Sequence, residues 1–352
     1  MLASSNSPGN SSGKSAVKRE QTTLAMRYEQ LGIVDVMSMV QMLMSLFRRN
    51  PEHATDWWGL NVLSLEIIRC FMGSEWTNEN AFPLYQKVIR GAPLSRRGET
   101  GRAFLGSDFQ TNPEFLSYLR KLHLFAESLF NLQHVPGLQH RIAGFKHNDL
   151  ESSLAELECA RMFSDHRMEL RFIRPKNQKG HDYEAEVICP GGRIVCCEFK
   201  AKSHATTPSQ RSLADTIKKA RQQLPEDRPG IVVIKVAESW VNQAGVGSAN
   251  NKAVTDALAS SDRLVAAVLV WVERVEEIPQ RYTYGVMNGI YFNRASRFYG
   301  SDIEVLLQHV GKGANWMSIL ELVKITLEHR GAWESNIPEG HVPGEPGIGL
   351  YS

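Results

Sequence analysis

The stretch DYEAEVICPGGRIVCCEFK, residues 182–200, decides how this chain folds. Two runs rich in strand-forming side chains flank Pro-Gly-Gly, which favours a tight turn, so the stretch predicts a β-hairpin. With the middle glycine at the centre of the turn, Asp182 lies opposite Lys200. Glu184 then lies opposite Glu198. Because strand side chains alternate between two faces, these four charged groups are expected on one side of the sheet.

The segments around this hairpin predict the order helix, strand, strand, strand, helix, strand. An amphipathic helix pattern precedes the hairpin and is followed by MELRFIRP, whose apolar and polar side chains alternate. A basic helix and the apolar run GIVVIKV, which suits a buried strand, come after it. The sequence therefore predicts an α/β fold, α+β overall. The expected helices are 150–163, 212–224 and 250–260, with further helices over about 302–328. The expected strands are 168–175, 182–188, 193–200, 230–236, 264–272 and 282–292.

The chain is long enough for two domains, and its pattern changes near residue 148. Residues 1–21 are rich in Ser, Gly and Asn, which predicts a disordered tail. From 22 to 145 the apolar spacing is helical and strand-like alternation is scarce, so an all-helical N-terminal domain is expected. The second domain is expected over 146–330. The Gly- and Pro-rich residues 331–352 predict a flexible tail.

The composition is that of an ordinary globular protein, with 42% hydrophobic residues, 22% charged residues and a net charge of +2. Any affinity for nucleic acid must therefore come from a local basic patch. The N-terminus lacks the apolar run of a secretory signal, and polar residues interrupt Leu31–Phe47 at helical spacing, so no membrane span is expected. The five cysteines lack zinc-ligand spacing and are expected to be reduced, which indicates a cytoplasmic protein.

Carboxylates and a lysine at the open end of one hairpin suit chemistry on phosphate. Mg²⁺ takes oxygen ligands, usually one or two carboxylates together with substrate phosphate and water. An ion held in this way can activate water and neutralise the charge of a phosphate under attack. The pattern therefore predicts hydrolysis of phosphodiesters with Mg²⁺ or Mn²⁺. The alternative interpretation is a solvated strand face, on which Glu184, Glu186 and Lys202 form cross-strand ion pairs.

The residues from Glu156 through Asp182 to Glu198-Phe199-Lys200 resemble the PD-(D/E)xK superfamily of restriction endonucleases, resolvases and repair nucleases. The resemblance covers about 90 of the 352 residues. It implies a restriction-endonuclease-like αβββαβ core around a central mixed sheet. It also implies that Asp182 and Glu198 are metal ligands, that the Phe199 carbonyl is a further ligand, and that Lys200 is the catalytic lysine. A nuclease is expected, and an endonuclease rather than an exonuclease.

The resemblance leaves a choice of acid at two positions. His181 stands where the family name has a proline, and the DYE stretch offers Glu184 as an alternative to Asp182, which is preferred. The family often adds an acid on the first helix. Glu156 has apolar neighbours at helical spacing, whereas Glu158 has a basic neighbour that explains it as an exposed ion pair. Because a carboxylate that faces the sheet needs a reason, Glu156 is chosen as the additional catalytic residue.

Basic residues gather around the predicted site. Residues 161–235 hold fifteen Lys and Arg against nine Asp and Glu, a local net charge of +6. This surface is expected to bind the phosphate backbone of nucleic acid, with DNA preferred. The alternative is a helix face that Lys and Arg keep soluble. The candidate nucleic-acid-binding residues are Lys176, Lys179, Lys202, Arg211, Lys218 and Lys219. The resemblance also implies a Gln on the second helix that assists the catalytic site, for which Gln222 or Gln223 is the candidate.

Two other functions are compatible with the sequence. A nuclease fold with a decayed site would be a catalytically inactive module that binds nucleic acid or a protein. The helical N-terminal domain could also bind a protein partner or a second copy of the chain, with Trp57–Trp58 as an anchor. A helical core is the simpler interpretation of these tryptophans.

Overall fold

The computed structural model describes a mixed α/β protein. The predicted tails, residues 1–21 and 331–352, lie outside the described residues. The described residues are 36–49, 56–81, 112–145, 150–166, 168–176, 178, 180–189, 191–202, 207–237, 240–241, 251–278, 281–310 and 318–328.

The described residues before 146 are helical, as the sequence predicted, and the strands begin only after α8. In chain order the elements are α2 (Val36–Arg49), α3 (Asp56–Met72), α4 (Ser74–Asn80), α6 (Asn112–Leu132), α7 (Leu138–Phe145), α8 (Leu150–Ser164), β1 (Glu169–Phe172), β2 (Ala185–Ile188), β3 (Ile194–Ala201), α9 (Gln210–Gln223), β4 (Gly230–Lys235), α11 (Lys252–Ala259), β5 (Leu264–Ile278), β6 (Arg281–Phe292), α12 (Ser301–Val310) and α13 (Ile319–Glu328).

The described elements form two compact units. One contains α2, the first part of α3 and α13, and the other contains the remaining elements. Within the first unit, Gly59 of α3 allows close packing, because a Cβ atom there would lie 2.7 Å from Val323 and 2.9 Å from Phe47. This grouping brings together segments far apart in the chain, so the predicted domain boundaries at residues 145 and 330 stay predictions.

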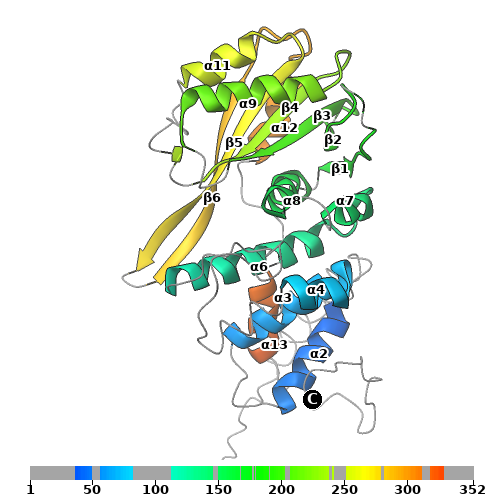
Figure 1. Cartoon of the computed structure of the whole chain (residues 1–352), viewed down its shortest axis with the longest axis vertical. Helices are drawn as coiled ribbons and strands as arrows, with labels where there is room; N and C mark the ends of the chain where they lie inside the picture. Colours follow the sequence, from blue (N-terminus) through cyan, green and yellow to red (C-terminus); the bar gives the residue numbers. More distant parts are fainter. Residues whose placement is uncertain are drawn as a thin grey trace, which may run out of the picture. The chain divides into compact units, whose positions relative to one another are not determined.

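One six-stranded sheet organises the second unit (Figure 1). Its strands lie in chain order from β1 to β6. The pairs β1–β2, β2–β3 and β5–β6 are antiparallel, whereas β3–β4 and β4–β5 are parallel. The sheet is therefore mixed and open, and its mixed character agrees with the expectation.

The β2–β3 hairpin has the register that the sequence predicted. Ala185 pairs with Cys197, and the following pairs keep the same centre at the middle glycine of the turn. Gly192 has φ 80°, a left-handed conformation that glycine adopts at no steric cost. The expected pairing of Asp182 with Lys200 is wrong, because β2 begins only at Ala185 and the ladder does not reach residue 182.

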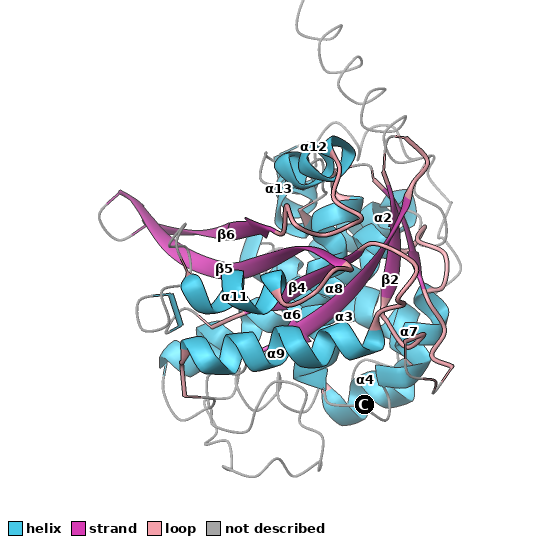
Figure 2. Ribbon diagram, turned by 90° about the horizontal axis from the view of Figure 1, so that it is seen from above, coloured by secondary structure: helices cyan, strands magenta, loops and turns pink. Residues whose placement is uncertain are grey.

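Helices lie against both faces of the sheet (Figure 2). Phe199 of β3 stacks on Phe163 of α8, with 6.4 Å between the ring centroids. Cys196, whose side chain points to the other face by strand alternation, belongs to a buried core with Leu213 and Ile217 of α9. The sheet is therefore sandwiched between α8 on one face and α9 with α11 on the other.

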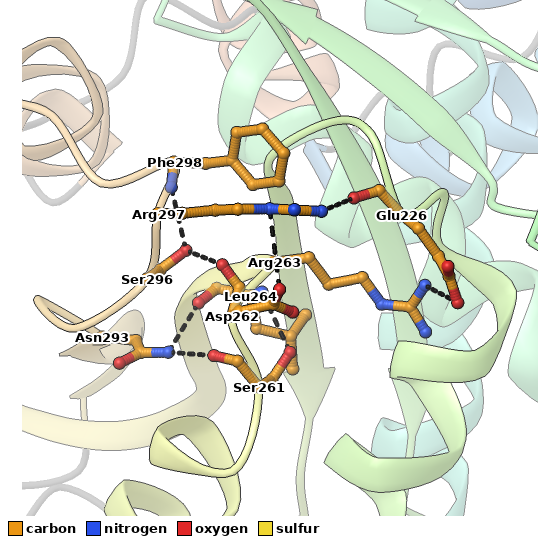
Figure 3. Close-up of polar contacts among 9 residues, drawn as sticks. All are labelled: Glu226, Ser261, Asp262, Arg263, Leu264, Asn293, Ser296, Arg297 and Phe298. Carbon is orange, nitrogen blue, oxygen red and sulfur yellow. Dashed lines mark hydrogen bonds and ion pairs between the residues drawn. The ribbon is translucent and has the colours of Figure 1, made fainter.

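Polar contacts close the end of the sheet where β5 begins and β6 ends (Figure 3). Asn293, directly after β6, donates from Nδ2 to the backbone oxygens of Ser261 and Leu264, at 2.7 and 2.9 Å. Arg297 donates to the backbone oxygen of Glu226, in the segment that leads to β4. We call these contacts the polar clamp. Because β3, β4 and β5 are parallel, the polar clamp lies at the opposite end of these strands from Lys200.

All five cysteines are free thiols. Cys70 on α3 is exposed, and the other four are buried. Within the described ranges, no helix combines the length and the apolar character that crossing a membrane requires.

Candidate active site

Three charged side chains meet at the end of the β2–β3 ladder. Lys200 forms an ion pair with Glu198, and its Nζ lies 3.8 Å from Glu184 Oε1. The other oxygen of Glu184, Oε2, accepts a hydrogen bond of 2.9 Å from the backbone N–H of Phe199. This bond ties the carboxylate to the backbone of β3. The hairpin therefore brings Glu184, Glu198 and Lys200 together, and we call these three residues the hairpin cluster.

Glu198 is a fully buried carboxyl group, with 0% of the residue exposed. Among the described residues neither of its oxygens has a hydrogen bond of normal geometry, although Lys200 forms an ion pair with Oε1. Burial, followed by the neighbouring carboxyl group of Glu184, raises the pKa of Glu198 well above the ordinary glutamate value. Burying such a group is costly, so a functional reason for it is expected.

Lys200 keeps its positive charge in spite of its burial. Burial acts to lower the pKa of Lys200, but the charges of Glu184 and Glu198 act in the opposite direction, and the pKa is raised. The Lys200 side chain is 27% exposed, whereas the Glu198 side chain is fully buried. The hairpin cluster therefore combines a buried carboxyl group with a partly exposed, charged lysine.

A third carboxyl group, that of Glu156, comes from α8. Burial, followed by the charge of Glu184, raises the pKa of Glu156 to about 7, while nearby basic groups including Lys200 act to lower it. Glu156 is therefore near enough to the hairpin cluster for its charge to interact with those of Glu184 and Lys200, although the three carboxyl groups do not converge as one metal-binding group among the described residues. Glu158 instead forms an ion pair with Lys235 of β4. The structure therefore brings Glu156, and not Glu158, to the cluster.

The structure places Asp182 outside the hairpin cluster. Its Oδ1 accepts a hydrogen bond of 2.7 Å from the backbone N–H of Lys176, in the loop before β2. The next residue, Tyr183, donates its hydroxyl proton to Glu186 at 2.6 Å. The regular alternation that would put Asp182 on the same face as Glu184 is therefore broken before β2 begins. Glu184 takes the place in the cluster that was predicted for Asp182.

Glu186 belongs to a separate group of buried polar side chains. Besides the Tyr183 hydroxyl, it contacts Arg171 and Arg228, with the Arg228 ion pair at 3.0 Å. The exposed fraction is 2% for Glu186 and 6% for Glu184. The alternative interpretation is therefore wrong in expecting a solvated strand face, although Glu186 does form a cross-strand ion pair with Arg171.

The hairpin cluster fits a divalent cation in an open arrangement. Nowhere in the described ranges do three His, Cys, Asp or Glu side chains converge as a ready-made metal-binding group. Mg²⁺, however, is usually bound by one or two carboxylates, with water and substrate phosphate completing its shell. Glu184 and Glu198 supply two carboxyl groups beside one ammonium group, and among the described residues Glu198 Oε2 has no hydrogen-bond partner. The Phe199 carbonyl stays a predicted ligand.

The predicted nucleic-acid-binding residues fall into two sets. Lys202 is directed toward α9, where its Nζ donates to Ser212 Oγ at 2.9 Å and lies 5.7 Å from the centroid of the Trp240 ring. Gln223 is half-buried, and Lys179 lies outside the described residues. The exposed set consists of Lys176 in the loop before β2 and of Arg211, Lys218, Lys219 and Gln222 on α9.

Arg141 of α7 is a charged neighbour of the site that the sequence did not reveal. Its Nη1 lies 3.7 Å from Glu156 Oε2. It precedes the part of the chain that resembles the nuclease family, and no spacing pattern connects it with the hairpin. The predicted anchor Trp57–Trp58 lies in α3, and the side chains of both tryptophans are outside the described residues.

Comparisons of this chain with protein-family models, with curated proteins and with solved structures found no match.

Proposed function

We propose that this chain is a metal-dependent phosphodiesterase that cleaves DNA, with the hairpin cluster at its centre. The observation that carries the proposal is the meeting of Glu184, Glu198 and Lys200 at the end of one hairpin, beside Glu156. The chain order α8, β1, β2, β3, α9, β4 agrees with the αβββαβ core of the PD-(D/E)xK superfamily, which supports the restriction-endonuclease-like assignment.

The proposal gives each residue of the site a distinct task. Bound Mg²⁺ or Mn²⁺ supplies positive charge at the scissile phosphate and lowers the pKa of bound water. Glu184 and Glu198 would hold the ion, and Glu198 would have to lose its proton to act as a ligand. Lys200 stabilises the charge that develops on the phosphate and orients the attacking water. Glu156, whose pKa is about 7, can accept a proton through an outer-shell water near neutral pH.

The test measures cleavage of single-stranded and double-stranded DNA with Mg²⁺ and with Mn²⁺. Wild type is compared with Lys200→Ala and with a control, Lys252→Ala, whose side chain is exposed on α11. Wild type and the control are expected to cut DNA at the same rate, and Lys200→Ala is expected to lose activity by at least about 100-fold. Equal rates for wild type and Lys200→Ala would remove Lys200 from the mechanism.

The alternative function is a nuclease-fold module that binds DNA without cutting it. The exposed basic residues of α9 favour this alternative, because they suit a phosphate backbone whether or not the site is active. A calorimetric titration with Mn²⁺ separates the two functions. Mn²⁺ binding that is lost in Glu198→Gln supports the nuclease. DNA binding that falls with salt, without any Mn²⁺ binding, supports the inactive module.

A further inference from the structure

The guanidinium group of Arg141 is buried beside the acidic site with few partners. Its side chain is 14% exposed, and the distance from Nη1 to Glu156 Oε2 is 3.7 Å. Its Nε is buried and has no hydrogen-bond partner among the described residues. A guanidinium group carries five N–H donors, so burying one that makes a single loose ion pair is unfavourable. Packing energy alone does not explain why Arg141 is there.

The backbone sets the position of Arg141. The N–H of Phe172 in β1 donates to the Pro136 oxygen at 2.8 Å, just before α7 begins. Gly137 follows with φ 86°, and a Cβ atom there would lie 2.4 Å from the Phe172 oxygen. Only glycine allows this close approach of α7 to the sheet. Arg141, about one turn into α7, is therefore held near Glu156 by the fold.

A second buried arginine in the same unit, Arg161, has different partners from those of Arg141. Arg161 of α8 forms ion pairs with Glu127 at 3.6 Å and with Asp165 at 3.3 Å. Both partners lie away from the hairpin cluster, and the Glu127 pair joins α8 to α6. Arg141, in contrast, has as its carboxylate partner Glu156, whose charge interacts with Glu184 and Lys200 of the cluster.

The groups around Glu156 act in opposite directions on its protonation. Burial and the charge of Glu184 favour the neutral form of Glu156, while Arg141 and Lys200 favour the anion. Lys200 is already shared between Glu184 and Glu198. Arg141 is therefore the basic neighbour whose described contact within the site is with Glu156 alone.

We propose that Arg141 is a positioning residue, whose ion pair holds the Glu156 carboxyl group in the orientation that phosphodiester cleavage requires. This inference rests on the proposed function. It also extends the site beyond the six-element core, because α7 precedes α8. Supporting residues of metal sites change metal affinity or activity by about 10- to 100-fold when they are replaced.

The test is a double-mutant cycle in the full chain, with Arg141→Met, Glu156→Gln and the double variant. Arg141→Lys is the conservative variant. Arg193→Met is the matched control, because Arg193 forms an ion pair with Asp302 away from the site. The measurements are the Mn²⁺ dissociation constant by calorimetry, and kcat and KM for DNA cleavage. Arg141→Gln replaces Arg141→Met if thermal unfolding shows that the latter does not fold.

The expected result is an effect of Arg141 that disappears when Glu156 is neutral. Arg141→Met weakens Mn²⁺ binding and lowers kcat, each by about 10-fold, with KM little changed. Arg141→Lys keeps most of the Mn²⁺ affinity and most of kcat, and Arg193→Met changes neither quantity. In the Glu156→Gln background Arg141→Met has no further effect, because the two residues act as a unit. Additive effects, or no effect of Arg141→Met, would overturn the inference.

The inference and the proposed function fail in different ways. If wild type binds Mn²⁺ without cutting DNA and the cycle in Mn²⁺ affinity is non-additive, the proposed function fails and the role of Arg141 stands. If wild type cuts DNA and the cycle is additive, only the role of Arg141 fails. A wild type that neither binds Mn²⁺ nor cuts DNA overturns both.

Discussion

Glu184 connects the backbone of the hairpin with the charges of the site. One of its oxygens accepts the Phe199 N–H at 2.9 Å, and the other faces Lys200 at 3.8 Å. Both contacts depend on a side chain placed directly before β2. Asp182 has a shorter side chain, lies two residues earlier, and is already bonded to the Lys176 N–H. The carboxylate that serves the site is therefore Glu184.

The first prediction separates these two acids. Glu184→Gln is expected to weaken Mn²⁺ binding and DNA cleavage by at least about 10-fold, because it removes a charged ligand beside Lys200. Asp182→Asn is the matched control and is expected to change both by less than about threefold, because its contact lies in the loop. Calorimetry and a cleavage assay provide the measurements. The reverse order of effects would return Asp182 to the role that the sequence suggested.

The raised pKa of Glu156 predicts how stability depends on pH. Its folded-state pKa of about 7 lies above the ordinary value of 4.5, so the folded chain binds this proton more tightly than the unfolded chain. The stabilisation is complete below about pH 4.5 and is lost as the pH rises through about 7, a change of up to about 3 kcal/mol. Urea unfolding of the metal-free protein at a series of pH values measures it.

Glu156→Gln provides the control for this pH dependence. The variant lacks the titrating group but keeps Glu198, so the difference in unfolding free energy between wild type and variant isolates Glu156. That difference should fall as the pH rises from about 5 to about 8. A difference that stays constant over this range would show that Glu156 titrates normally.

Local patterns predicted part of the site and missed the rest for physical reasons. Strand alternation placed Glu198 and Lys200 together, and helix periodicity selected Glu156, because both depend on regular local geometry. Asp182 was misplaced because alternation does not reveal where a strand begins. Arg141 was missed because its contact with Glu156 depends on how α7 packs, which no local pattern encodes.

Among the elements, α7 depends most on a single backbone conformation. Its start is pressed against β1, where Gly137 has φ 86° and no room for a Cβ atom. The hairpin turn at Gly192 has a similar φ of 80°, but a Cβ atom there would meet nothing within 4 Å. The two glycines thus share a conformation and differ in their surroundings.

This contrast between Gly137 and Gly192 leads to a prediction about stability. Gly192→Ala is expected to cost about 1–2 kcal/mol, the cost of a left-handed conformation for a residue with a Cβ atom. Gly137→Ala is expected to cost more, because the backbone of β1 or α7 must also shift, and to impair the site through Arg141. Urea unfolding and Mn²⁺ titration measure the two effects. Equal costs for both variants would mean that α7 adjusts freely.

The hairpin and the sheet strands were predictable because each is a short, regular pattern between turn residues. The register followed from the Pro-Gly-Gly turn, and the run GIVVIKV became β4. The length of β5 was underestimated, since it continues to Ile278, whereas β6 begins at Arg281, within one residue of the expected start. Charged residues after Val272 lowered the apolar signal there, although the β5–β6 ladder continues through them.

Across the whole molecule, the hairpin cluster and the polar clamp lie at opposite ends of the parallel strands. The exposed basic residues of α9 extend along one face of the second unit. If DNA binds there, its affinity must depend on salt, because each neutralised phosphate releases counterions.

The contribution of α9 to this salt dependence can be tested by substitution. Replacing Lys218 and Lys219 with alanine is expected to weaken DNA binding and to reduce the slope of log affinity against log salt by about 2. The control replaces Lys252 and Arg294, two exposed basic residues elsewhere on the same unit, and is expected to leave the slope unchanged. Fluorescence anisotropy at several salt concentrations measures both. An equal loss in both double variants would indicate attraction by net charge alone.

The distribution of the thiols makes this chain convenient to label. Cys70 is the exposed thiol, and the other four are buried. A maleimide dye should therefore attach once per folded chain and five times in urea, which turns dye stoichiometry into a count of unfolded molecules. Attachment at Cys70 should be slower than at a fully solvated cysteine, because partial burial and the charge of Glu66 raise the pKa of the Cys70 thiol. No cysteine would need to be introduced or removed for a fluorophore to report on the native protein.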